Sequence, residues 1–377
     1  MEYLVNIGIK TEGPPVLKEF KDHTLVENML IGDTFHWQQT IVAKLPGQLS
    51  VIDKNKGNNS ITLSESDRNV TLINTLPLEK YLECVVASEM NPSSPSEFLK
   101  AHAVISRSWV LGKINRPHIP DRFGEVNTRE VLIGWDDDTG HVGFHVCSDD
   151  HCQRYQGLQP LSEETLKAIR ETKNEVIISN DGELIDARYS KCCGGETELF
   201  SSCWQSRDKN YLKKIIDPWC NLDAIDPASR RLVFSSILKE YDLSTQGYGF
   251  LWTSEISKED IRKNLKHKFN RDIGVIEDIR PLHRGPSGRI DLLRIKGSHG
   301  CLDLGKELWI RRLLSTTHLY SSAFDIVDKG DTIVLNGRGW GHGVGLCQMG
   351  AANMALHGFS YKDILTFYYP GAKIIKI

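Results

Sequence analysis

The sequence predicts an α+β protein with mixed sheets, and three regions of the chain support this fold class. Short runs of β-branched residues, separated by Gly, Asp and Asn, predict strands through residues 1–75. Apolar residues at helical spacing predict a pair of helices within residues 77–113. Strand and helix patterns then follow one another to residue 377.

Length and charge set the first limits on what the protein does. The 377 residues are 40% hydrophobic, enough for one large or two ordinary domains. A formal net charge of −3 gives no argument for a nucleic-acid partner. No apolar run approaches the roughly 18 residues that a transmembrane helix needs. The first fifteen residues lack the pattern of a signal peptide, so we expect either a cytoplasmic protein or a chain whose leader has been removed.

The strand and helix patterns indicate a coarse organisation. We expect residues 1–75 to form a β-rich N-terminal scaffold and residues 76–377 to form the second region, whose internal boundary is not visible. Within that region, residues 226–270 read as a helical insertion. Asn180-Asp181-Gly182 predicts a hairpin between strands at 174–179 and 184–190. Strands are predicted within 274–335, with helices near 306–316, 347–356 and 360–369 and a closing strand at 372–377.

The predicted helix pair carries the first candidate site residue. Pro77 suits the start of a helix, and Leu82 and Val85 mark its buried face. Glu89, four residues after Val85, continues that face. A carboxylate at this position is either a solvated helix-end charge or an acid held in a partly desolvated pocket. The second helix is rich in small residues and places Arg107 within possible reach of the first.

A glycine-rich stretch opens the last forty residues, with glycine at alternate positions from Gly337 to Gly345. A phosphate-binding loop is a weak interpretation, because no Lys-Ser/Thr follows and no βαβ context surrounds the glycines. We therefore expect a tight backbone turn. His342 and Gln348 then either face a ligand or satisfy the backbone.

The nine cysteines are an odd number, which excludes complete intramolecular pairing. We expect most of them to be small buried hydrophobic residues. Cys147 and Cys152, close to His141, His145 and His151, have the ligand character that suits zinc. A local disulfide or two ordinary buried thiols remain alternatives.

Four separated stretches together resemble the SpoIID/LytB family of bacterial cell-wall proteins. These are the segments YLECVVASEM and SPSEFLKAHAVISRSWVLGK in the helix pair, DARYSKCCGGETE around residue 190, and GRGWGHGVGLCQMGAANMALHG near the C-terminal end. The sequence departs from the family pattern at Cys192-Cys193 and at Cys347, where serine is common in the family. The resemblance covers about residues 65–375.

The resemblance implies roles for particular residues. Glu89 would be the catalytic acid of a peptidoglycan lytic transglycosylase. Arg107 would anchor substrate or orient Glu89, although a structural ion pair is an equal alternative. Tyr189 would face the cleft, and Gly194 and Gly195 would let the backbone approach a sugar closely. With His342 and Gln348 as further substrate-binding residues, the catalytic helix pair and the glycine-rich loop would line one substrate cleft.

The same resemblance implies a structural Zn²⁺ held by His141, Cys147 and Cys152. The implied reaction cleaves the MurNAc–GlcNAc bond of glycan strands that have lost their stem peptides, leaving 1,6-anhydroMurNAc ends. The implied partners are peptidoglycan glycan strands and a cell-wall amidase. Because peptidoglycan lies outside the cytoplasm, we expect an extracytoplasmic protein whose leader has been removed.

Three other functions remain open at this point. A non-catalytic glycan-binding module would enhance an amidase, and replacing Glu89 by Gln would leave that stimulation intact. A zinc hydrolase would use the cluster within residues 141–152, but the sequence shows no general base beside those ligands. A structural cell-wall protein would have no turnover.

Overall fold

The computed structural model describes residues 3–9, 11–31, 39–53, 70–115, 126–135, 141, 143–148, 152–222, 225–237, 250–315 and 319–377. It divides into two compact units that are interleaved along the chain. Unit 1 comprises residues 1–120, 138–187 and 373–377, and unit 2 comprises residues 121–137 and 188–372. Helices and mixed sheets occur in both units, which confirms the predicted α+β class.

Unit 1 contains nine strands and three helices among its described residues. These are β1 (Leu4–Ile9), β2 (Thr11–Glu19), β3 (His23–Ile31), β4 (Gln39–Pro46), β5 (Gln48–Asp53), β6 (Val70–Pro77), α1 (Leu78–Glu89), α2 (Ser96–Asn115), β9 (Val146–Cys147), α3 (Glu163–Glu171), β10 (Glu175–Ile178) and β19 (Lys373–Lys376). The sheet order β5-β6-β1-β9 places β9 parallel to β1, and β2-β3-β4 form a second, antiparallel sheet.

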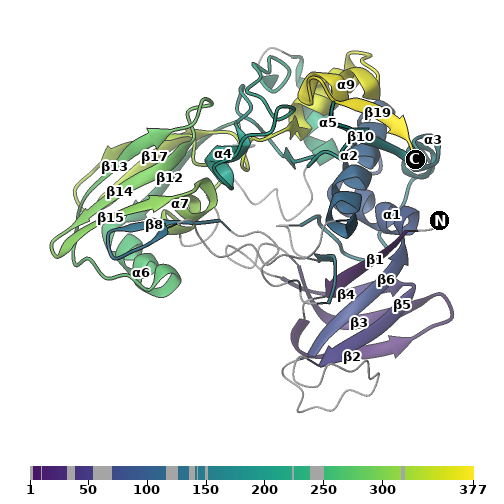
Figure 1. Ribbon diagram of the computed structural model, residues 1–377, viewed down its shortest axis with the longest axis horizontal. Coiled ribbons are helices and arrows are strands. Elements are labelled where there is room, and N and C mark those ends of the chain that lie inside the picture. Colours follow the sequence, from purple (N-terminus) through teal and green to yellow (C-terminus); the bar gives the residue numbers. More distant parts are fainter. Residues whose placement is uncertain are drawn as a thin grey trace. The chain divides into compact units, whose positions relative to one another are not determined.

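Helix α2 of unit 1 packs on a two-stranded sheet. Figure 1 shows α2 beside the pair formed by β10 and β19, and α1 and α3 pack against α2. The fully buried Ser108 of α2 accepts a hydrogen bond from the Ile177 amide of β10 at 2.9 Å. A small polar residue at this position therefore joins helix and strand, as the abundance of small residues in α2 suggested.

Unit 2 contains the remaining elements. These are β7 (Val126–Asn127), β8 (Val131–Ile133), β11 (Tyr189–Ser190), α4 (Phe200–Cys203), α5 (Pro227–Ile237), β12 (Leu251–Ser257), α6 (Lys258–Phe269), β13 (Ile276–Arg284), β14 (Ile290–Gly297), β15 (Gly300–Gly305), α7 (Glu307–Leu313), β16 (Phe324–Asp328), β17 (Thr332–Arg338), β18 (Leu346–Cys347), α8 (Gln348–Leu356) and α9 (Tyr361–Tyr368).

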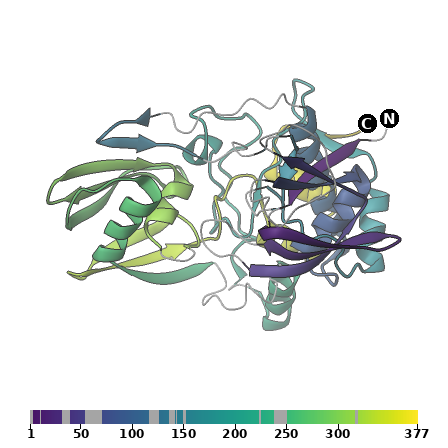
Figure 2. The same cartoon turned by 90° about the horizontal axis from the view of Figure 1, so that it is seen from below.

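The core of unit 2 is shared by two sheets and two helices. One sheet has the order β13-β14-β15-β8-β7 and the other β12-β17-β16. α6 packs against β12 and β13, and α7 packs against β14 and β15. Figure 2 shows the green α6 among the strands of this unit. Apolar side chains of both sheets and both helices form one buried cluster. We expect the burial of these side chains to be the main contribution to the stability of unit 2.

Two sequence predictions of secondary structure are confirmed only in part. The Asn180-Asp181-Gly182 turn forms a short hairpin, with an antiparallel bridge between Ile178 and Leu184 and a hydrogen bond from the Ile185 amide to the Ile177 carbonyl, but the long second strand does not form. β10 also pairs with β19, and the chain passes into unit 2 after Ala187. The expected helical insertion at 226–270 contains the helices α5 and α6, but also strand β12, whose partner β17 lies far along the chain.

Other predictions are confirmed. The closing strand, the helix stopped by Gly358 and the strands of residues 274–335 all form. No helix among the described residues combines the length and hydropathy that a membrane crossing requires. The domain boundary predicted near residue 75 stays a prediction.

Candidate functional site

The end of α1 holds the first candidate residue, Glu89. Leu82 and Val85 are fully buried on the inner face of α1, as their spacing predicts, and so are Tyr81 and Val86. Pro92 follows soon after the helix, and proline is unfavourable within a continuing helix. Glu89 is half-buried at this helix end, and its Oε1 accepts a hydrogen bond from the Arg154 amide at 3.0 Å.

The segment of residues 152–157 is joined to α1 at two further points. The Gln156 amide donates to Ser88 Oγ at 3.1 Å, and the Tyr81 hydroxyl donates to Gln153 Oε1 at 3.0 Å. Both contacts are buried. The backbone around Glu89 is therefore fixed by a segment that lies more than sixty residues away in sequence.

His141, Cys147 and Cys152 gather as predicted from the sequence, directly before this segment. Their ligand atoms lie within 4.8 Å of one another. Cys147 Sγ is 3.8 Å from Cys152 Sγ, and His141 Nε2 is 3.6 Å from the same sulfur. The separation of the two sulfurs is too long for a disulfide and matches the distance of about 3.8 Å between thiolates on tetrahedral zinc.

The nearby histidines differ in their hydrogen bonds. His145 Nδ1 accepts from the Asn6 amide at 3.1 Å, which holds His145 against β1, and burial lowers the pKa of His145. His141 Nε2 faces the sulfurs instead. His151 lies outside the described residues. Cys147 is placed by β9, which pairs with Gly8 of β1.

Arg107 of α2 is fully buried and contacts the start of α1, not its end. Its Nε and Nη2 each donate to the Glu79 carboxylate at 2.9 Å, and its Nη1 donates to the Glu175 carbonyl at 3.1 Å. This bidentate pair is the strong form of an arginine–carboxylate contact. The described contacts support the structural ion pair, one of the two alternatives that the sequence left open.

Unit 2 brings the remaining candidate residues together. β11, which carries Tyr189, pairs in parallel with β18 at the end of the glycine-rich stretch. Cys192 and Trp340 exchange backbone hydrogen bonds of 3.0 and 2.7 Å. The alternate glycines 339, 341, 343 and 345 all have positive φ, between 73° and 95°. The stretch is thus the predicted tight backbone turn, and it lies along the strand that carries Tyr189.

Gly345 of this turn and Gly194 beside it both have positive φ and lie close to neighbouring backbone. A Cβ on Gly345 would lie 2.1 Å from the Arg188 carbonyl oxygen. A Cβ on Gly194 would lie 3.1 Å from the Gly339 amide nitrogen. Gly195, with φ +96°, has open space where a side chain would be, so its backbone is approachable.

His342 is a neutral imidazole with a defined tautomer. Burial and the charges of Arg188, Arg289 and Arg311 lower its pKa well below the ordinary value. Its Nδ1 accepts from the Val344 amide at 3.0 Å, so the proton belongs on Nε2. Trp204 packs edge-on against the ring at 4.9 Å. Gln348 is buried at the first position of α8.

A buried polar network, which the sequence analysis did not single out, supports the glycine-rich turn. The fully buried Arg289 donates to the carbonyls of Cys193 and Gly341 at 3.1 and 3.3 Å. Ser287 donates to Glu198 at 2.6 Å and accepts from Arg289 at 2.9 Å. Spacing gives no signal for this network, because its members come from separate elements.

The candidate residues therefore belong to two groups. Glu89, Arg107, His141, Cys147 and Cys152 lie in unit 1. Tyr189, Gly194, Gly195, His342 and Gln348 lie in unit 2. Each group is built by contacts within its own unit, and the single cleft expected from the sequence stays a prediction.

Comparison with known proteins gives two family matches and several relatives. Residues 66–178 match the stage II sporulation protein family (SpoIID), and residues 198–345 match a domain of unknown function (DUF8618). The chain is 26% identical over 309 residues to an uncharacterized protein of Brachyspira hyodysenteriae, covering 81% of this chain and 68% of the relative.

Two relatives come from Bacillus subtilis. Identity is 25% over 303 residues to its stage II sporulation protein D, covering 80% of this chain and 75% of the relative. Identity is 27% over 321 residues to its amidase enhancer, covering 78% of this chain but 40% of that longer protein. These matches confirm the resemblance to the SpoIID/LytB family that the sequence motifs indicate.

Proposed function

We propose, from the SpoIID domain at residues 66–178, that this protein is a peptidoglycan lytic transglycosylase with Glu89 as its acid. The observation that carries the proposal is the placement of Glu89. A half-buried carboxyl group at a helix end, fixed by the Arg154 amide at 3.0 Å, is a positioned acid and not a freely rotating surface charge.

The proposed chemistry needs one carboxyl group in two roles. Glu89 first protonates the glycosidic oxygen as the bond from MurNAc C1 to that oxygen breaks. The carboxylate then accepts the proton of the MurNAc C6 hydroxyl while that oxygen bonds to C1, which gives the 1,6-anhydro end and returns Glu89 to its acid form. Because the Arg154 amide donates a hydrogen bond to Oε1, the proton that Glu89 transfers would be held on Oε2.

The donor set of His141, Cys147 and Cys152 fits Zn²⁺. One imidazole nitrogen and two thiols within 4.8 Å of one another are ligands of the type that structural zinc takes. A bound Zn²⁺ would supply a rigid cross-link there. Cys152 lies two residues before Arg154, so the cluster is placed to fix the segment that positions Glu89.

We assign glycan contact to the group in unit 2. Gly195 offers approachable backbone, and Tyr189 offers a phenol on a strand held by β18. The neutral His342 also hydrogen-bonds to the Tyr189 backbone and so helps to position that strand. Arg107 acts as a positioning residue, since it holds the helix that ends at Glu89. The substrate class implies an extracytoplasmic protein and a cell-wall amidase that removes the stem peptides first.

The test is a digestion of peptide-free glycan strands by the full chain, with products identified by mass spectrometry. We compare the protein with Glu89→Gln and with Glu83→Gln, a matched control on the same helix that pairs with Lys80. We expect anhydro-ended products from the protein and from Glu83→Gln, and a loss of at least about 100-fold in Glu89→Gln. Reducing-end products, or equal rates in all three proteins, would refute the proposal.

The amidase-enhancer function is the second candidate, favoured by the similarity to a protein of that name. It predicts that Glu89→Gln still stimulates an amidase on intact peptidoglycan while no glycan bond is cleaved. A zinc hydrolase predicts instead that Glu89→Gln stays active and that Cys147→Ser with Cys152→Ser does not.

A further inference from the structure

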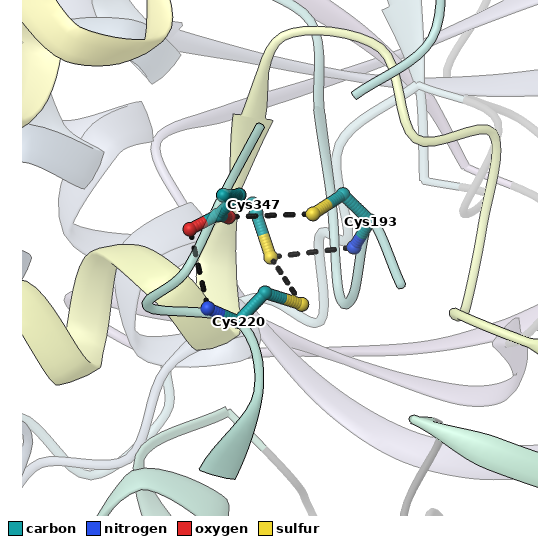
Figure 3. A group of neighbouring side chains, drawn as sticks. Cys193, Cys220 and Cys347 are labelled. Carbon is teal, nitrogen blue, oxygen red and sulfur yellow. Dashed lines mark hydrogen bonds between the residues drawn. The ribbon is translucent and has the colours of Figure 1, made fainter. Parts of the chain in front are cut away.

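Unit 2 contains a second group of potential metal ligands, distinct from the cluster in unit 1. Cys193, Asp217, Cys220 and Cys347 are all buried, and their ligand atoms lie within 4.8 Å of one another. Figure 3 shows the three cysteines turned toward one another. Cys192 adjoins them, with its sulfur 3.4 Å from that of Cys220.

Three chain segments far apart in sequence supply this group. Cys193 follows β11, Cys220 lies in the loop before α5, and Cys347 ends β18 and caps α8. Cys220 Sγ lies 3.4 Å from Cys347 Sγ, too far for a disulfide and close to the distance of about 3.8 Å between thiolates on one tetrahedral zinc ion. The arrangement is therefore of the kind that a metal ion closes.

The Cys347 sulfur accepts two hydrogen bonds from the backbone. The amides of Cys193 and Gly350 donate to it at 3.3 and 3.4 Å. The second amide belongs to the first turn of α8, where the helix dipole favours negative charge. Donors of this kind stabilise a thiolate ligand.

The carboxylate of the group is held in a fixed orientation. Asp217 Oδ1 accepts from the amides of Trp219 and Cys220, and Oδ2 accepts from the Tyr368 hydroxyl at 2.8 Å. The Cys193 thiol also points at Oδ2, at 3.3 Å. A Cβ on Gly350 would lie 2.1 Å from the Tyr368 hydroxyl, so glycine is needed there for this packing.

We propose that Cys193, Cys220, Cys347 and Asp217 bind a thiophilic divalent cation, Zn²⁺, as a structural site. Three sulfur donors and one oxygen donor, fully enclosed, complete the four positions of a structural zinc. Soft sulfur donors select zinc over magnesium or calcium. Binding releases a proton from each coordinating thiol.

The position of this site suggests a structural role next to the candidate residues of unit 2. Its ligands join β11, the loop at 217–220 and the start of α8, which are the segments that carry or flank Tyr189, Gly194, Gly195 and Gln348. A bound metal would therefore fix these segments relative to one another.

The experiment measures metal in the full chain, purified with zinc under reducing conditions, by inductively coupled plasma mass spectrometry. The variants are Cys147→Ser with Cys152→Ser, which removes the cluster of unit 1, and Cys220→Ser with Cys347→Ser. The matched control is Cys203→Ser, another buried thiol of unit 2, whose sulfur lies 3.6 Å from the His342 carbonyl.

The proposal expects one zinc equivalent to remain when Cys147 and Cys152 are replaced, and to be lost when Cys220 and Cys347 are replaced as well. Cobalt added to the Cys147/Cys152 variant should give thiolate charge-transfer bands and tetrahedral visible bands. The cobalt spectrum is recorded on the Cys147/Cys152 variant, so it tests the site even if the variant that also lacks Cys220 and Cys347 does not fold.

Absence of both zinc and cobalt bands in the Cys147/Cys152 variant would overturn the proposal. A disulfide among Cys192, Cys193, Cys220 and Cys347, found by non-reducing mass spectrometry of protein purified without reductant, would overturn it too. If one equivalent of zinc remains after Cys147 and Cys152 are replaced, the site in unit 2 is supported even if the cluster of unit 1 binds no zinc. The two zinc assignments are therefore tested independently.

Discussion

At the scale of single residues, the buried Arg107 is expected to contribute more to stability than most charged groups. Its guanidinium has no exposed surface and makes two bonds of 2.9 Å to Glu79. Removing one partner of a buried ion pair is strongly destabilising, because the other charged group is left without a partner. We expect Arg107→Ala to lower the free energy of unfolding by roughly 3 kcal/mol, measured by urea denaturation.

The matched control is Arg170→Ala on α3. Arg170 pairs with Glu163, but both side chains are more than half exposed. Such a pair is expected to contribute less than about 1 kcal/mol. Equal losses in the two variants would contradict the importance assigned to the buried pair, and with it the role of Arg107 in holding α1.

His102 of α2 predicts a dependence of stability on pH. Burial lowers its pKa from 6.5 to about 3, and its Nδ1 lies 3.2 Å from Ser106 Oγ. Between pH 6.5 and 3 the unfolded chain binds a proton that the folded chain does not, so stability falls as pH falls through that window. Relative to His102→Gln, the protein should lose about 3 kcal/mol between pH 7 and 4, measured by denaturant titrations. A difference that stays constant with pH would contradict this.

At the scale of elements, the backbone of the glycine-rich turn comes closest to β11 at Gly345. Gly345 has φ +73°, and a Cβ there would lie 2.1 Å from the Arg188 carbonyl oxygen. Gly345→Ala must therefore separate β18 from β11, at a cost of about 2–4 kcal/mol. Gly358→Ala is the control, since its φ is +84° but nothing lies within 4 Å. It should cost only about 1 kcal/mol. Thermal unfolding of both variants measures the difference, and equal losses would refute the argument.

The sequence predicts elements well where their signals are local. Ser360 caps α9 where the pattern places a helix start, and Gly358 stops α8. The turn at Asn180 forms, but the strand predicted after it is short, because the chain passes into unit 2 after Ala187. The other partner of β10, β19, lies almost two hundred residues away, and no local pattern reveals such a partner.

The same limit applies to the candidate site. Cys147 and Cys152 are close in sequence, so their proximity to His141 was predictable. Cys193, Cys220 and Cys347 looked like ordinary buried thiols, because residues separated by 27 and 127 positions carry no spacing signal. Only the fold brings them together.

At the scale of the whole molecule, the two units are not consecutive pieces of chain. The chain passes between them after residues 120, 137, 187 and 372. Such passages leave no linker composition to detect, which is why a boundary was not visible in the sequence. Unit 1 combines segments from both ends of the chain, and unit 2 combines residues 121–137 with residues 188–372, so the stability of each unit rests on long-range pairing.

The final strand allows this dependence to be tested. β19 is the described partner of β10 across four residue pairs, and the Ile377 amide donates to the Asn174 carbonyl at 3.0 Å. Deleting residues 373–377 leaves the backbone of β10 without that partner. We expect hydrogen exchange in residues 174–178 to become faster by at least about tenfold, or about 1.4 kcal/mol. Exchange in residues 276–305 of unit 2 should not change.

The control for that deletion is Ile375→Ser, which alters a side chain that is 37% exposed and keeps the backbone of β19. Its exchange in residues 174–178 should stay close to that of the unaltered chain, because the ladder hydrogen bonds remain. Faster exchange in both units after the deletion would mean that they unfold together. Unchanged exchange in residues 174–178 would mean that β19 contributes nothing to unit 1. Faster exchange in residues 174–178 alone establishes that the last strand of the chain stabilises the unit that contains Glu89.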